Sequence, residues 1–117
     1  MKVIIAGSRS VTSYAAVEAA IVKSGFTISE VVSGTARGVD RLGELWAARN
    51  GVPIEKFPAD WDTYGKRAGY LRNKEMALHA EALVAIHDGE SRGTRHMIDI
   101  AREAGLKVSV TTVEVEG

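Results

Sequence analysis

The ten residues from Val31 to Asp40, VVSGTARGVD, combine an apolar pair with glycine, hydroxyl and basic residues. We expect Gly34 to take the positive φ of a turn, and Gly38 to let the backbone approach a ligand that a Cβ would block. Thr35 and Arg37 supply a hydroxyl and a cation. A helix that begins near Gly38 would direct free N–H groups and the positive end of its dipole at the same point, which favours phosphate or carboxylate. The alternative is a tight turn from a strand to a capped helix, with no ligand.

Two more apolar runs end in loops of similar composition. Residues 3–5, VII, lie just before GSRS at 7–10, and residues 82–86, ALVAI, lie just before HDGESRGT at 87–94. Neither loop matches the GxGxxG dinucleotide fingerprint or the P-loop pattern GxxxxGK(S/T). Three strands that each end in glycine, hydroxyl and arginine residues nevertheless predict that the loops form one pocket.

The remaining pattern indicates alternating strands and helices. Apolar residues at helical spacing predict helices at 11–22 with a stop at Gly25, 38–50, 67–80 and 92–104. Short apolar runs predict strands at 3–5, 31–32, 54–57, 82–86 and 108–113. Such alternation is typical of a parallel sheet covered by helices on both faces. The 117 residues are therefore expected to form one α/β domain with a five-stranded, mostly parallel sheet.

The commonest topology of such sheets predicts where the pocket lies. Ligands bind beyond the carboxyl ends of the strands, at the point where the strand order reverses. In the order 3-2-1-4-5, that crevice would lie between the first and fourth strands. These are the strands that end in GSRS and GESRGT.

Composition limits the possible partners. Fifteen basic and fifteen acidic residues balance, so no global field draws the chain toward nucleic acid or an anionic membrane. Cysteine is absent and the three histidines lack a metal-binding spacing, so we expect neither a metal nor a required cofactor. The first apolar run is too short for a signal peptide, and no segment reaches membrane-spanning length. We therefore expect a cytoplasmic protein with no membrane partner.

The segment from Pro58 to Gly69, PADWDTYGKRAG, is longer than a connection requires and reads as a loop. Its aromatic residues Trp61 and Tyr64 could stack on a base. The alternative is that Trp61 covers the edge of the core or an oligomer interface. Trp46 has a helix-face spacing with neighbouring leucines and is expected in the core.

Three motifs resemble those of one nucleotide-binding superfamily. SGTARGVD at 33–40 resembles the glycine-rich loop of DNA-processing protein A. RNKEM at 72–76 resembles the arginine helix of the LOG phosphoribohydrolases, and SRGT at 91–94 resembles the end of their PGGxGT loop. The shared superfamily is SLOG, and the whole chain is most similar to its small stand-alone YspA-like branch, common in bacteria and phages. The resemblance implies one Rossmann-like, three-layer domain that binds a nucleotide.

The LOG resemblance also implies residue roles. The catalytic arginine of those enzymes falls on Arg72, and the residues that hold a 5′-phosphate fall on Gly93 and Thr94. Their catalytic glutamate falls on Met97, whose thioether cannot act as a general acid or base. Glu44 and Asp99 are the carboxylates that we would expect to replace it. The sequence therefore favours a binding protein over an enzyme.

We expect the chain to bind or sense a nucleotide or nucleotide-derived ligand, either ADP-ribose-like or a nucleoside phosphate. One alternative is a LOG-type phosphoribohydrolase that cleaves an N-glycosidic bond. A second is single-stranded DNA binding, as in DNA-processing protein A, which the zero net charge and few aromatic residues disfavour. Six arginines could form a cationic cluster that suits one nucleotide better than a strand, unless each is a solvated surface charge: Arg9, Arg37, Arg41, Arg72, Arg92 and Arg95.

The expected ligand-binding residues come from the three loops and from the predicted helix at 67–80. Glycines would allow backbone approach, hydroxyls would donate to phosphate or ribose, arginines would neutralise charge, and Asp40 or Asp88 would accept from a ribose hydroxyl. The set is Gly7, Ser8, Arg9, Ser33, Gly34, Thr35, Arg37, Gly38, Asp40, Arg72, Asp88, Gly89, Ser91, Arg92, Gly93 and Thr94.

The resemblance to LOG proteins further implies a homodimer or higher homo-oligomer, paired through helices beside the site. We expect the apolar surface for this contact to come from Leu71, Met76, Leu78 and Leu83, with Trp61 nearby.

Overall fold

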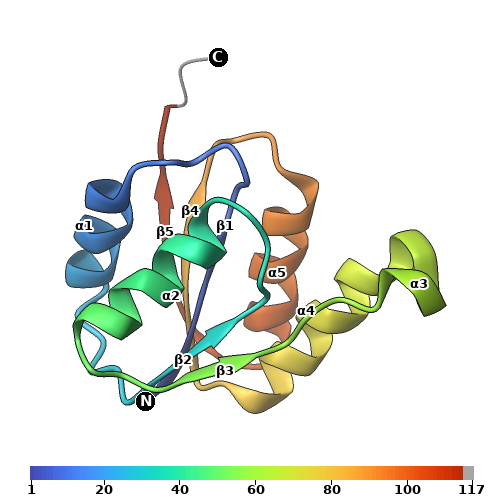
Figure 1. The fold of residues 1–117 in the computed structure, drawn as a ribbon, viewed down its shortest axis with the longest axis horizontal. Coiled ribbons are helices and arrows are strands. Elements are labelled where there is room, and N and C mark those ends of the chain that lie inside the picture. The colour runs from blue at the N-terminus through green and yellow to red at the C-terminus, as the bar shows by residue number, and fades with distance from the viewer. Residues whose placement is uncertain (115–117) are drawn as a thin grey trace.

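Strand β1 (Lys2–Gly7) lies at the centre of a five-stranded parallel sheet in the computed structural model, which describes residues 1–114 (Figure 1). β2 (Glu30–Ser33) and β3 (Ile54–Lys56) extend the sheet on one side. β4 (Ala82–His87) and β5 (Lys107–Thr112) extend it on the other. The observed order β3-β2-β1-β4-β5 confirms the predicted topology, and all four strand pairs are parallel rather than most of them.

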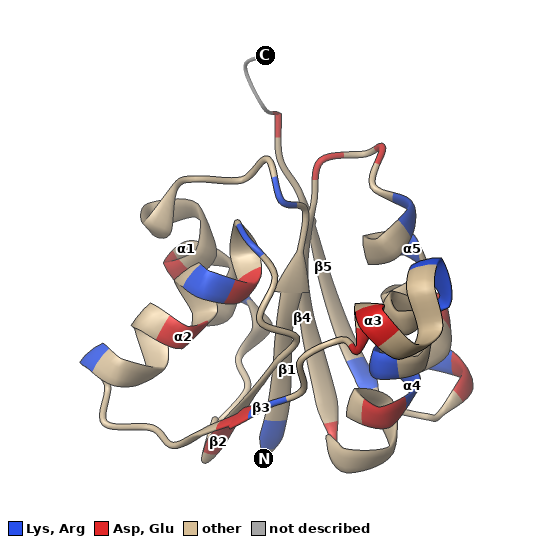
Figure 2. Ribbon diagram, turned by 45° about the vertical axis from the view of Figure 1, so that its right-hand side comes forward, with Lys and Arg blue, Asp and Glu red and all other residues tan. Residues whose placement is uncertain are grey.

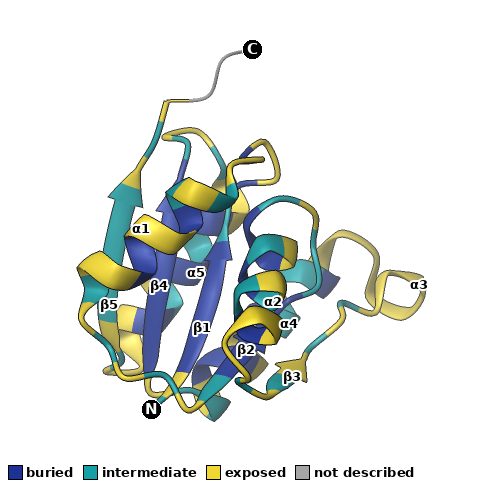
Figure 3. Ribbon diagram, turned by 60° about the vertical axis from the view of Figure 1, so that its left-hand side comes forward, coloured by how far each residue is buried: buried dark blue, intermediate teal, exposed yellow. Residues whose placement is uncertain are grey.

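Two helices cover each face of the sheet. Helices α1 (Tyr14–Ser24) and α2 (Val39–Arg49) pack on one face, and α4 (Ala68–His79) and α5 (Arg92–Glu103) pack on the other (Figure 1). The alternation along β1 explains this arrangement, because Val3 and Ile5 join the core under α1 and α2, whereas Ile4 joins the core under α4 and α5. The central strands are buried on both faces, as their continuous apolar runs predict (Figure 3). This is the Rossmann-like, three-layer domain expected.

The structure differs from the sequence prediction at the start of α1 and in the segment after β3. α1 begins at Tyr14, because the Ser13 hydroxyl caps it by accepting the Ala16 N–H at 3.1 Å. The segment expected as a loop contains the short helix α3 (Trp61–Tyr64) and the 3₁₀ turn η1 (Gly65–Arg67). Asp60 caps α3 by accepting the Thr63 N–H at 3.1 Å, a local bond that hydrophobic periodicity does not report.

The prediction of the apolar surface that would mediate oligomerisation is partly wrong. Met76 and Leu83 are buried, because Met76 on α4 and Leu83 on β4 belong to the core between α4, α5 and the sheet. Leu78 is 86% exposed and Trp61 is 49% exposed, so these two residues remain available at the surface. Trp46 is partly buried against the core under α1 and α2, as expected. The homodimer stays a prediction.

Within residues 1–114, none of the helices combines the length and the apolar character that crossing a bilayer requires.

Gly7 at the end of β1 lies close to both β4 and α2, and its replacement provides a test of this packing. A Cβ on Gly7 would lie 2.1 Å from the Ile86 carbonyl oxygen and 2.8 Å from Val39 Cγ2. Because the first of these atoms is backbone in the centre of the sheet, we expect Gly7→Ala to destabilise the fold by about 3 kcal/mol or more. Urea unfolding measures this. Gly93→Ala is the control, because no heavy atom lies within 4 Å of its Cβ position. Equal stability of Gly7→Ala and wild type would contradict the packing.

Candidate functional site

A cavity of about 510 Å³ lies at the carboxyl edge of the sheet, between the ends of β1 and β4 and the helices α4 and α5. This volume is within the range of small-molecule sites, roughly 300–1,000 Å³. The cavity lies where the strand order reverses, as the topology predicts. Eight of the predicted ligand-binding residues line it: Gly7, Arg9, Asp40, Arg72, Asp88, Ser91, Gly93 and Thr94. The other eight lie outside its lining: Ser8, Ser33, Gly34, Thr35, Arg37, Gly38, Gly89 and Arg92.

Two of the hydroxyls outside the lining are used within the protein. The buried Ser8 hydroxyl accepts the Asp88 N–H at 3.0 Å. The buried Ser33 hydroxyl donates to Glu44 Oε2 at 2.6 Å and accepts the Thr35 N–H at 3.1 Å. Both serines therefore hold the loops around the cavity in place.

The glycines of SGTARGVD act differently from the prediction. Thr35, not Gly34, takes the positive φ of the turn, at 63°. Gly34 instead makes room for side chains, because a Cβ there would lie 2.9 Å from both Arg72 Nη1 and Asp40 Oδ2. Gly38 does have a positive φ of 74°, but its Cβ would meet the protein's own backbone, 2.5 Å from the Ser8 carbonyl oxygen. The prediction that Gly38 admits a ligand is therefore wrong, since the loop after β1 occupies that space.

Arg72 extends from α4 to the loop after β2 and lines the cavity. Its Nη1 donates to the Gly34 carbonyl, and its Nε donates to Asn73 Oδ1 at 3.1 Å. Asn73 is itself buried, and its amide nitrogen lies 3.4 Å from the Gly93 carbonyl oxygen and 3.1 Å from His96 Nδ1. α4 and α5 are tied together by these bonds, which fix the direction of the guanidinium.

Burial shifts the pKa values of two charged side chains that line the cavity, Arg72 and Asp40. Burial lowers the pKa of Arg72, the nearby cation of Arg9 lowers it further, and Asp40 acts in the opposite direction. Burial also raises the pKa of Asp40 from its ordinary value of 3.8 to about 6, against the effects of the Ala36 N–H and of Arg72. The Asp40 carboxyl thus lies close to the Arg72 guanidinium, and the Arg9 cation also acts on Arg72. Two cations this close to one another favour an anion between them.

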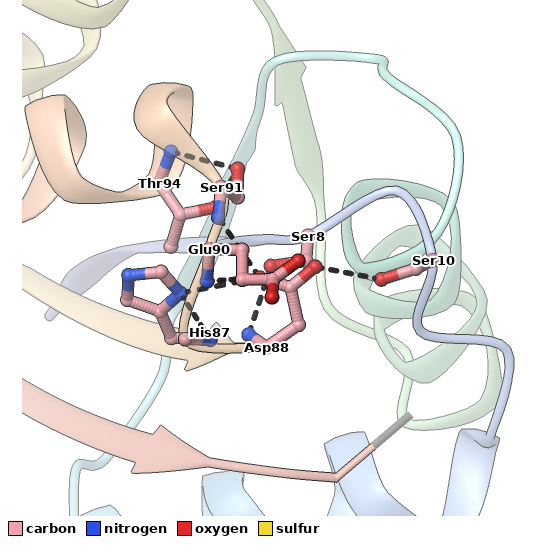
Figure 4. A network of polar contacts seen from close by, with 8 residues as sticks. Ser8, Ser10, His87, Asp88, Glu90, Ser91 and Thr94 are labelled. Carbon is pink, nitrogen blue, oxygen red and sulfur yellow. Dashed lines mark hydrogen bonds and ion pairs between the residues drawn. The ribbon is translucent and has the colours of Figure 1, made fainter. Parts of the chain in front are cut away.

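Asp88 organises the loop after β4 (Figure 4). Its Oδ1 accepts the N–H groups of Glu90 and Ser91 at 2.8 and 2.9 Å, and its Oδ2 accepts the Ser10 hydroxyl at 2.9 Å. These hydrogen bonds hold the pKa of Asp88 well below its usual range. Ser91 then caps α5, accepting the N–H and the hydroxyl of Thr94 at 3.3 and 2.9 Å. The loop after β1 and the start of α5 are therefore joined through one carboxylate.

The predicted cluster of six arginines does not form. Only Arg9 and Arg72 line the cavity, whereas Arg37, Arg41, Arg92 and Arg95 are exposed elsewhere. Figure 2 shows acidic and basic positions interspersed along α2, α3 and α4. The positive charge of the site is local, as the balanced composition predicts.

The two carboxylates expected to replace the catalytic glutamate of the LOG enzymes do not line the cavity. Glu44 bonds to Ser33 and lies 3.7 Å from Lys56 Nζ, and Asp99 is exposed on α5. Neither lines the cavity, although Met97 does. The lining carboxylates are Asp40 and Asp88, and of these only Asp40 has a raised pKa.

Several lining residues were missed because they lie on α4 and on the segment before it. Gly69, Arg72, Asn73 and Met76 line the cavity at the spacing of one helix face. That spacing was readable from the sequence and would have added Asn73. The other lining residues outside the predicted set are Ala6, Ser10, Ala36, Lys66, Tyr70 and Met97, together with Trp61, for which the sequence allows either a stacking role or a core role.

The fold and the cavity define a Rossmann-like domain with its site at the topological switch point. Residues 1–64 match the YspA, cpYpsA-related SLOG family, and the chain belongs to this family. The chain is 42% identical over 84 residues to the Gene 61 protein of Mycobacterium phage D29, covering 67% of each protein.

The fold also resembles a solved structure. DNA processing protein A from Streptococcus pneumoniae superimposes with a TM-score of 0.74 at 21% identity, over 93% of this chain. The chain spans about half of that protein, 49% of its length. At this identity the similarity establishes the fold alone.

Asp40 provides a pH-dependent test of the site. Between its ordinary pKa of 3.8 and about 6, the folded protein binds more protons at Asp40 than the unfolded chain does. Its contribution therefore lowers stability as the pH rises from about 4 to about 7, by about 3 kcal/mol at most. Asp40→Asn cannot ionise, so its stability relative to wild type should increase over that range. Urea unfolding of both proteins at each pH measures the difference, and a pH-independent difference would contradict the raised pKa.

Proposed function

We propose that the cavity binds a nucleotide or nucleotide-derived ligand, with a phosphate between Arg9 and Arg72. The observation that carries this proposal is that two guanidinium groups, Arg9 and Arg72, line one cavity and lie close enough for the Arg9 cation to lower the pKa of Arg72. Two arginine cations that repel each other gain from an anion placed between them. Phosphate is suited to this, because guanidinium groups bind its oxygens through paired, charge-assisted hydrogen bonds.

The start of α5 supports the same position for the phosphate. Ser91, Gly93 and Thr94 line the cavity at the N-terminal end of this 12-residue helix. The helix dipole favours an anion there, and Gly93 leaves open space where a side chain would stand. The cation pair and the helix end therefore face one cavity.

Asp40 makes hydrolysis of an N-glycosidic bond the second candidate function. A carboxyl group with a pKa of about 6 can serve as a general acid or base near neutral pH. Asp40 lines the same cavity as Arg72, unlike Glu44 and Asp99. Single-stranded DNA binding has less support, because a strand requires a longer basic groove than two arginines provide.

Thermal unfolding with added nucleotide tests the proposed function. A ligand at about 100 times its dissociation constant stabilises the folded state by about 2.7 kcal/mol, so AMP, ADP or ADP-ribose should raise the melting temperature. Arg9→Ala removes a charge-assisted contact and should weaken binding by about 10- to 100-fold. Arg41→Ala is the matched control, because Arg41 is exposed and lies outside the cavity.

No shift with any mononucleotide, dinucleotide, cyclic nucleotide or ADP-ribose would contradict the proposal. Equal weakening by Arg9→Ala and Arg41→Ala would show a general charge effect instead of a site.

Chromatography of AMP incubated with the protein separates binder from hydrolase. We expect little or no free adenine, because Met97 stands where the LOG resemblance places a glutamate, and loss of a general acid or base removes about 10²- to 10⁴-fold in rate. Steady release of adenine that Asp40→Asn abolishes would contradict the binding assignment and establish the second candidate.

A further inference from the structure

The cavity has an aromatic end as well as a cationic one. Trp61 and Tyr70 both line it, and they are 49% and 45% exposed. Neither residue belongs to the two hydrophobic clusters that form the core. Large aromatic side chains dominate cores and interfaces, so two half-exposed rings on one cavity are a surface for a further apolar group.

Local contacts hold the indole of Trp61 beside the cavity. Trp61 is the first residue of α3, which Asp60 caps through the Thr63 N–H. A Cβ on Gly69 would lie 3.3 Å from Trp61 Cη2 and 3.9 Å from Arg72 Nη2. The far edge of the indole therefore lies against the backbone at the start of α4, next to the guanidinium.

Tyr70 is held by a contact with α5. Its ring meets that of His96 edge-on, with centroids 4.5 Å apart and planes at 68°. His96 is itself joined to Asn73, so the tyrosine ring is supported by the bonds that orient Arg72. α3 stands beyond the start of α4, away from the sheet, while the loops after β1 and β4 lie at the carboxyl edge (Figure 1). Trp61 and Tyr70 thus come from α3 and α4, whereas Arg9, Ser91 and Thr94 come from the carboxyl edge of the sheet.

The alternative that Trp61 covers the core edge does not fit its exposure or its absence from the core clusters. Stacking on a planar base would cover the ring, and Trp61 and Tyr70 line the same cavity as Arg72 and Arg9. We infer that Trp61 and Tyr70 form a base-binding subsite, which stacks the purine or pyrimidine of a nucleoside 5′-phosphate. This inference rests on the proposed function.

The test compares AMP with ribose 5-phosphate, which carries the same phosphate and sugar but no base. Stacking on an aromatic side chain should make AMP bind roughly 5- to 150-fold more tightly. Trp61→Ala should remove most of that advantage and leave the affinity for ribose 5-phosphate unchanged. Tyr64→Ala is the matched control, since Tyr64 is on the same short helix, is 51% exposed and does not line the cavity.

Fluorescence gives a second measurement that does not depend on a cavity variant. The chain has two tryptophans, so Trp46→Phe leaves Trp61 as the only indole. AMP should change the emission of Trp61 in this protein more than saturating ribose 5-phosphate does.

Equal affinities for AMP and ribose 5-phosphate would overturn the base-binding subsite and leave the proposed phosphate site intact. The same conclusion follows if Trp61→Ala retains the full preference for AMP, or changes only the mass measured by light scattering. Failure of both probes to bind would overturn the subsite for a nucleoside 5′-phosphate, and failure of every nucleotide and of ADP-ribose would overturn the proposed function with it.

Discussion

The structure depends on the close meeting of three chain segments at Ser8. The Ser8 N–H donates to the Ile86 carbonyl at 3.1 Å, and its carbonyl accepts the N–H groups of Val11 and Val39 at 3.3 and 3.5 Å. Its hydroxyl accepts the Asp88 N–H at 3.0 Å. Only glycine at position 38 permits this approach, because a Cβ there would lie 2.5 Å from the Ser8 carbonyl oxygen. These bonds fix the loop after β1 to the end of β4 and to the start of α2, and all three segments contribute residues to the cavity.

The electrostatics of the site follow from the same packing. Gly34 has no side chain, so Arg72 and Asp40 both reach the space above it. Their burial costs more than their mutual attraction returns, which raises the pKa of Asp40 and lowers that of Arg72. A bound phosphate would complete this arrangement, and it would do so without a strongly basic protein surface. The balanced net charge and a local anion site are therefore compatible.

The fold was predictable from the sequence because the buried strands have continuous apolar runs and each helix has a clear face. The strand order was predicted from the commonest topology of such sheets, and the polar loops at 7–10 and 87–94 lie at the switch point that this order creates. The site was predicted only in part. A pattern of glycines and hydroxyls cannot distinguish a residue that faces a ligand from one that supports a loop, and Ser8, Ser33 and Gly38 do the latter. The prediction of the aromatic residues was incomplete, because Tyr70 lies on α4 and not in one of the polar loops.

The most direct test of a nucleotide site at this cavity is a titration of isotope-labelled protein with AMP, followed by backbone and side-chain amide resonances. The largest shifts are expected at Ser10, Gly93 and Thr94, at the Arg72 Nε–H and at the Trp61 indole N–H. The groove between α1 and α2, lined by residues such as Ala19 and Val22, should remain unchanged. If saturating AMP shifts no resonance around the cavity, or shifts only those of the α1–α2 groove, the result contradicts a nucleotide site at this cavity.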